Sequence, residues 1–238
     1  MKNSKLRRAL LLLACAVLLV SLSVGATLAY LTAQTPTVVN TFTVGQVIIK
    51  LDEAVVDVDG VPGTITSFDE TTGQHFTTPV DKLEDADRGM KNWYKLMPNH
   101  LYTKDPTVYV DAKSEPCYIF VKVVNPIAAI EDPAYLIADQ MSSKGWIAVS
   151  GVDNVYAYCG TAQTPAIVNA GAELIVFDNF KINKDAKAGT APETATEAEA
   201  KLYLAQYEGQ TITVVAYAIQ ADQVSGTAEQ IWALGNWN

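Results

Sequence analysis

The sequence has few residues of the types that carry most enzyme chemistry. Its 238 residues include two histidines, His75 and His100, and three cysteines. It contains no His-Glu-x-x-His pair, and Ser150 lacks the first glycine of a Gly-x-Ser-x-Gly nucleophile elbow. No glycine-rich phosphate loop is present. We therefore predict no catalytic residue, no metal ligand and no cofactor, although a Cys-His pair brought together by the fold stays open.

Positive charge is scarce and unevenly placed. Acids outnumber bases 26 to 17, for a formal net charge of -9, which argues against nucleic acid as a partner. Four of the bases lie in the first eight residues, and no charged residue occurs from Ala9 to Ile49. The acidic carboxylates of the body suggest a solvated surface. The sharper alternative is calcium held by the clustered carboxylates of Asp57, Asp59, Asp81, Glu84, Asp85 and Asp87. The Asp57-x-Asp59-Gly60 stretch does not follow the EF-hand pattern, however.

The first 29 residues have the layout of a secretory signal peptide. A basic end from Lys2 to Arg8 precedes a 16-residue apolar run, and small residues then occupy positions -3 and -1 of a cut after Ala29. We predict cleavage between Ala29 and Tyr30, so that only the leader enters the membrane. An uncleaved anchor and lipidation at Cys15 are the alternatives. Cleavage would leave 209 residues with a net charge of -13.

Two cysteines remain in the exported chain. A disulfide between Cys117 and Cys159 is permitted outside the cell. Two buried thiols in strands are the other reading, and spacing alone does not choose between them.

Alternating apolar residues and turn signals predict many short strands. Thr37 to Leu51 is predicted as a strand with a bend at Gly45, Asp52 to Asp87 as hairpins and loops, and Trp93 to Asn99 as a strand entering a turn. Further strands are expected at Thr107 to Val110, Cys117 to Val124, Gly145 to Val149, Asn154 to Cys159, Glu173 to Ile182 and Thr211 to Gln220. Cys117 to Val124 is apolar on both faces apart from Lys122, which predicts a central position.

Helix signals are fewer. We expect a short helix capped by Asp132 with Pro133 at its first position, a helix from Glu193 to Tyr207 capped by Thr190, and a helix from Ala228 to Leu234 capped by Thr227. Because strands outnumber helices, the pattern favours a mainly β fold: an antiparallel β-sandwich over residues 45–238 with a few short peripheral helices, preceded by the signal peptide.

Three stretches of the sequence resemble a known family. Gly25 to Leu31 followed by Asn40 to Gly45, Leu96 to Asp105, and Gly209 to Ala221 are similar to the TasA/camelysin (CalY) family of Gram-positive bacteria. In the second stretch, Asn99 stands where the family pattern Leu-x-Pro-Gly…Thr-Lys-Asp has glycine. Both residues tolerate a left-handed turn.

The resemblance implies a jelly-roll sandwich that is exported by a dedicated SipW-type signal peptidase. It also implies a secreted biofilm-matrix fibre subunit, whose N-terminal segment completes a sheet of the next copy. Camelysin carries a metallo-endopeptidase label, which is one alternative function. A monomeric cell-surface binding module, using Trp93, Trp146, Trp232 and Trp237 on a binding face, is another.

The mature N-terminal segment suits strand donation. Residues 30–44 carry no charge and are rich in threonine and valine, and Pro36 places the strongest pairing after it. Head-to-tail donation generates an open homopolymer. The residues expected to pair are Thr37, Val38, Val39, Asn40, Thr41, Phe42 and Val44. The alternative is that Thr37 to Leu51 pairs within its own sheet, and we expect Val47 to Leu51 to do so.

Overall fold

The computed structural model describes residues 7, 10–18, 45–186, 197–235 and 237. The chain divides between Val44 and Gly45 into two units. In the first, residues 10–18 are helical. No helix of the described residues has the length and apolar character to cross a membrane. The predicted cleavage site at Ala29 and Tyr30, and the predicted donor residues from Thr37 to Val44, lie outside the described residues.

The second unit is mainly antiparallel β-structure, built around the strand β7 (Cys117–Val124). β7 lies between β12 (Thr213–Gln220) and β9 (Val155–Tyr158), and β8 (Trp146–Ala148) forms the far edge of the same sheet. The central position predicted for Cys117 to Val124 is confirmed. The side chains of β7 are apolar on both faces apart from Lys122, so both faces of the strand can be buried.

A second sheet packs against the first. It has the order β10-β6-β1-β4, formed by β10 (Glu173–Ile175), β6 (Thr107–Val110), β1 (Ile49–Ala54) and β4 (Arg88–Gly89). All its pairings are antiparallel, with Ile49 opposite Val110. The predicted pairing of Val47 to Leu51 within its own sheet is confirmed for Ile49 to Leu51. The predicted strand from Thr37 begins only at Ile49 in the described part.

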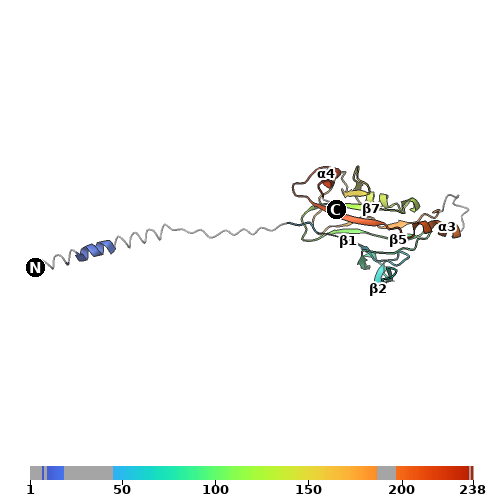
Figure 1. Ribbon diagram of the computed structural model, residues 1–238, viewed down its shortest axis with the longest axis horizontal. Coiled ribbons are helices and arrows are strands. Elements are labelled where there is room, and N and C mark those ends of the chain that lie inside the picture. Colours follow the sequence, from blue (N-terminus) through green and yellow to red (C-terminus); the bar gives the residue numbers. More distant parts are fainter. Residues whose placement is uncertain (1–6, 8–9, 19–44, 187–196, 236, 238) are drawn as a thin grey trace. The chain divides into compact units, whose positions relative to one another are not determined.

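The two faces of the first sheet have different covers. Ile119 and Val121 of β7 point into the larger core, which includes Val108 of the second sheet. Tyr118 and Phe120 point the opposite way, into a smaller core with Ile231. Figure 1 shows α4 (Ala228–Trp232) on this outer side of β7 and β1 on the other side. The fold is therefore sandwich-like, with α4 as a partial outer cover.

Two small sheets complete the strand set. β2 (Gly63–Asp69) and β3 (Gln74–Pro79) form the hairpin expected in the turn-rich region, with Gly73 at a positive φ of 70° in its turn. β5 (Leu101–Thr103) pairs with β11 (Asn179–Lys181). The single strand predicted from Glu173 to Ile182 is wrong, because the chain breaks after β10 and its second half joins a different sheet.

The helices are short. They are η1 (Leu83–Asp85), η2 (Ala128–Ile130), α2 (Ile137–Ser143), α3 (Glu197–Leu204), η3 (Ala205–Tyr207) and α4. The predicted cap at Asp132 is wrong: α2 begins after Leu136, and the Asp132 carboxylate accepts the Ala134 N–H and pairs with Lys181. The predicted cap at Thr190 lies outside the described residues, whereas the Thr227 capping box on α4 is confirmed.

The segment before β5 departs from prediction in one respect and follows it in another. Residues 91–97 belong to no helix or strand, so the predicted strand from Trp93 is wrong. Asn99 has a φ of 59°, the left-handed turn conformation expected where the family pattern has glycine.

Candidate functional site

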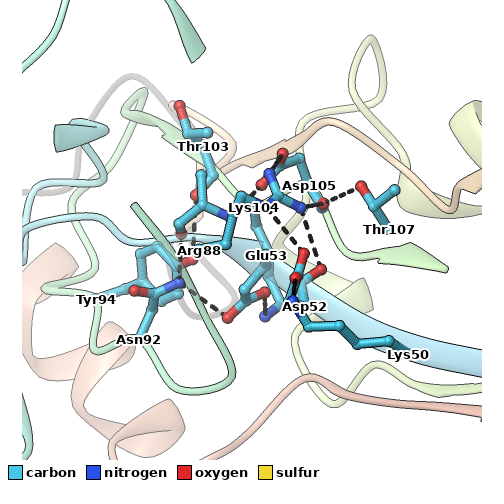
Figure 2. A network of polar contacts seen from close by, with 11 residues as sticks. Lys50, Asp52, Glu53, Arg88, Asn92, Tyr94, Thr103, Lys104, Asp105 and Thr107 are labelled. Atoms are coloured by element: carbon cyan, nitrogen blue, oxygen red, sulfur yellow. Dashed lines mark hydrogen bonds and ion pairs between the residues drawn. The ribbon is translucent and has the colours of Figure 1, made fainter. Parts of the chain in front are cut away.

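The main polar cluster of the described residues is centred on Arg88 of β4. Its Nε lies 2.9 Å from Asp52 Oδ1 on β1, and its Nη1 lies 2.5 Å from Asp105 Oδ2. Nη2 donates to the backbone carbonyls of the same two residues, each at 3.3 Å. Figure 2 shows the guanidinium between the two carboxylates. One arginine therefore joins β1 to the chain between β5 and β6.

A second ion pair lies deeper. Lys104 Nζ is 2.5 Å from Glu53 Oε2, and both side chains are almost fully buried. The other Glu53 oxygen accepts from Asn92 Nδ2 at 2.9 Å, and the same amide donates to the Ala54 carbonyl at 2.9 Å. The Tyr94 hydroxyl donates to the Thr103 carbonyl at 3.0 Å. The segment at 92–94, which joins no sheet, is thereby fixed to β1 and β5 (Figure 2).

Asp52 and Arg88 in this cluster each favour the charged form of the other. Burial alone would raise the pKa of Asp52, but hydrogen bonds and charge from Lys50 and Arg88 outweigh it and hold that pKa below its ordinary value. For Arg88, burial works toward a lower pKa, yet Asp105 and Asp52 together raise it. Burial, reinforced by the charge of Glu53, raises the pKa of the Tyr94 hydroxyl well above its ordinary value.

The arrangement is suited to holding strands together. Its three carboxylates, from Asp52, Glu53 and Asp105, face three cations, and Asp105 Oδ1 also accepts the Ala54 N–H at 2.7 Å. Each carboxylate oxygen therefore already has a donor from within the protein. We infer a structural clamp that gives the Thr103-Lys104-Asp105 stretch its role.

Sequence reasoning missed this clamp. It placed Asp52 and Glu53 in hairpins and loops, because residues 52–87 are turn-rich, acidic and poor in long apolar runs, whereas both residues belong to β1. The available signal was the Thr103-Lys104-Asp105 stretch, in which two charges lie one residue before the strand β6.

The two histidines have ordinary structural roles. His75 Nε2 lies 2.7 Å from the Lys91 carbonyl oxygen, and His100 Nε2 lies 2.7 Å from the Asp59 carbonyl oxygen. Each imidazole therefore donates an Nε2–H to the backbone. No group of three histidine, cysteine, aspartate or glutamate side chains that could hold a metal occurs among the described residues. Asp57 instead accepts the N–H groups of Asp59 and Val61 in its own turn.

Cys117 and Cys159 are both buried free thiols. Cys117 belongs to the core between the sheets, and Cys159 to the core under α4, so their side chains point to opposite faces of one sheet. Burial raises the pKa of Cys117 to about 11 and also raises the pKa of Cys159. Of the two alternatives, the structure has the buried thiols and not the disulfide.

The tryptophans do not gather on one face. Trp146 is buried between the sheets and donates its Nε1–H to the Ile175 carbonyl at 2.9 Å. Trp232 stacks on Trp237 at 4.5 Å between ring centroids, on the outer side of the first sheet, and Trp93 lies against the β2–β3 turn at Gly73.

A shallow cleft of about 500 Å³ lies along β8, beside α2. Its lining residues include no carboxylate, amine, imidazole or thiol. Its polar side chains include the hydroxyls of Ser142, Tyr156 and Thr161 and the amide of Gln163.

Comparison with known proteins found no relatives. No family model matches the chain, and no curated protein or solved structure is significantly similar to it.

Proposed function

We propose that this chain is an exported structural protein that assembles head to tail by donating its N-terminal strand. The resemblance to the TasA/camelysin family suggests the setting, a fibre of the extracellular biofilm matrix of a Gram-positive bacterium. The protein is not an enzyme in this proposal, and its principal partner is a second copy of itself. A SipW-type signal peptidase is the partner that releases it from its leader.

The observation that supports the proposal is the junction between the uncharged segment and β1. Glu115 donates its N–H to the Gln46 carbonyl at 3.0 Å, and Asp111 donates to the Ile48 carbonyl at 3.0 Å. The chain is therefore held beside its own sheet from Gln46 onward. The uncharged residues 30–44 directly precede this anchor, so a donated strand would be tied to a fixed body.

The charge distribution supports the same function. Proteins blunt exposed sheet edges with charges, and a segment that lacks them is suited to pairing with another chain. The acidic body keeps assembled copies soluble and limits non-specific association. Association through the uncharged segment is therefore favoured over non-specific aggregation of the acidic bodies.

The test combines N-terminal sequencing with electron microscopy of the secreted protein. We expect an N-terminus at Tyr30 and growing fibres. Deleting residues 30–40 should abolish the fibres while leaving the far-ultraviolet circular dichroism and the melting temperature of the monomer unchanged. Fibres that persist after the deletion would overturn strand donation.

The same material separates the rival functions. A persistent monomer with an intact N-terminus would indicate a surface-binding module. Proteolysis that a chelator abolishes, and that His100→Ala also abolishes, would indicate the peptidase.

A further inference from the structure

The first sheet has an edge without the usual protection. β12 spans eight residues, Thr213–Gln220, and pairs in continuous register with β7 on one side. No described strand pairs with its other side. The strand contains no charged residue, no proline and no bulge, which are the devices that protect natural edges.

The other edges of the described strands are short or carry a protective feature. In the two small sheets, β5 and β11 have three residues each, β2 has a register shift between Ile65 and Ser67, and β3 ends in Pro79. β8 has three residues, β10 has three and includes Glu173, and β4 has two and includes Arg88. β4 pairs only with Glu53 and Ala54 of β1. The earlier residues of β1 have no described strand on that side, but they include the charged Lys50 and Asp52. Among the described strands, β12 is thus the long uncharged edge.

The backbone groups on that edge can be assigned. Ala221 donates its N–H to the Pro116 carbonyl at 2.9 Å, which marks a hydrogen-bonded pair of the β7–β12 ladder. Such pairs alternate along antiparallel strands, so Thr213, Val215, Tyr217 and Ile219 also bond toward β7. The residues between them therefore turn their N–H and C=O groups to the free edge. These are Val214, Ala216, Ala218 and Gln220.

We propose that the free edge of β12 is the acceptor for residues Thr37–Val44 of a second copy of this chain. This inference rests on the proposed function and names the surface that receives the strand. The donor stretch has eight residues, as β12 has, and it is likewise uncharged. Its last residue adjoins Gly45, so the chain leaves the donor body directly at the end of the donated strand.

The side chains beside the edge fit an incoming strand. Val214, Ala216 and Ala218 pack against the core between the sheets, where they are only half-buried. Two of them are alanines, which leave room beside the core for larger side chains such as Phe42 and Val44. Burial of these apolar side chains at the sandwich edge would add to the main-chain hydrogen bonds.

The test uses the chain beginning at Tyr30 and one matched pair of substitutions. Ala216→Pro removes an N–H that points to the free edge, so the β7–β12 ladder stays intact while strand addition is blocked. Ala148→Pro is the control on β8, the opposite edge of the same sheet. Val149 donates its N–H to the Val155 carbonyl, and Cys159 donates its N–H to the Gly145 carbonyl. Because bonded pairs alternate along antiparallel strands, the N–H of Ala148 points away from β9, to the free edge.

We expect Ala216→Pro to remain a folded monomer that forms no fibres, and Ala148→Pro to form fibres like the parent chain. A fibre-forming Ala216→Pro variant would overturn the β12 assignment while leaving strand donation intact. Loss of fibres in Ala148→Pro, with Ala216→Pro unaffected, would assign the acceptor to β8.

Mixing two defective variants gives an independent readout. Ala216→Pro retains its donor strand, and the variant lacking residues 30–40 retains its acceptor edge. Because the interface is head to tail, their mixture should form a one-to-one dimer that grows no further, as measured by light scattering after chromatography. Two folded variants that stay monomeric when mixed would overturn the proposal.

Discussion

Lys104 and Glu53 form an ion pair that is almost fully out of contact with water. Their Nζ and Oε2 atoms are 2.5 Å apart, and the side chains are 9% and 8% exposed. The carboxylate and ammonium groups each lose most of their hydration on folding, and each is stabilised by the other. The ion pair therefore adds little net stability to the fold. Removing either partner alone is nevertheless destabilising, because it leaves a buried charge without a counter-ion.

Removing one partner should be costly. Lys104→Met leaves Glu53 as a buried charge without a counter-ion, and we expect a loss of about 3–5 kcal/mol in the free energy of unfolding. The double variant Glu53→Met/Lys104→Met removes both charges and should recover more than half of that loss. Urea denaturation of the three proteins measures the effect.

An exposed pair supplies the control for this experiment. Lys82 and Glu84 lie 3.4 Å apart and are 69% and 74% exposed. Lys82→Ala should therefore cost less than about 1 kcal/mol. A comparable loss at both sites would show that burial does not govern the Lys104–Glu53 pair.

Acid should weaken the clamp through Asp52. Its folded-state pKa lies below the ordinary value of 3.8, so the folded protein binds fewer protons than the unfolded chain in that range. The contribution of Asp52 is therefore present above pH 3.8 and is lost as the pH falls through the folded pKa. Asp52→Asn should be less stable than the parent at pH 7, and the two should converge in strong acid.

Glu131 should show the opposite sign. Burial raises its pKa above the ordinary value of 4.5, despite a hydrogen bond from Asn125. The contribution of Glu131 to the free energy of unfolding is therefore largest below pH 4.5, and it declines as the pH rises through the folded-state pKa. Glu131→Gln should remove that decline. Urea titrations at several pH values between 2 and 7 are the measurement for both residues.

The two thiols of the chain beginning at Tyr30 should be inert while it is folded. With a pKa of about 11, Cys117 is ionised in only about one molecule per thousand at pH 8. We expect negligible reaction with a thiol-specific disulfide reagent until denaturant is added, and then two thiols per chain. A melting temperature that falls on adding reductant would instead indicate a disulfide.

The sequence was sufficient for elements whose signals are local. β7 follows from an apolar run broken only by Lys122, and the α4 cap follows from Thr227 and Gln230 three residues apart. The central place of β7 could also be predicted, because a strand that is apolar on both faces is typical of the covered interior of a sheet.

Elements that depend on distant partners could not be predicted. The segment 92–94 looks like a strand, but it is held by side chains such as Asn92 and has no sheet neighbour. The stretch from Glu173 to Ile182 reads as one strand because nothing local marks the point at which it changes sheets. The clamp joins Glu53 to Lys104, which are 51 positions apart in the sequence. The spacing of charged residues does not reveal which of them pair over such a separation.

Asn99 offers a test of the turn that precedes β5. Because its φ is 59°, a β-branched residue there should be strained, and Asn99→Val should cost about 1–2 kcal/mol. Asn99→Gly should change stability by less than about 0.5 kcal/mol, since glycine adopts this conformation freely. Asn169→Val is the control, at an exposed position that is not among the residues with positive φ. Equal effects of valine at both positions, in thermal unfolding, would contradict the argument.

The capping box of α4 should stabilise the outer cover of the first sheet. Gln230 donates its N–H to Thr227 Oγ1 at 3.4 Å, and Thr227 donates its N–H to Gln230 Oε1 at 2.9 Å. Thr227→Ala should lower the free energy of unfolding by about 1 kcal/mol. Since the two bonds are reciprocal, Gln230→Ala in the Thr227→Ala background should cost less than it does alone. Ile231 is buried in the core beneath α4, so Ile231→Ala should cost about 2–5 kcal/mol, more than the loss of either cap bond. Strictly additive effects of the first two substitutions would show that the cap bonds act independently.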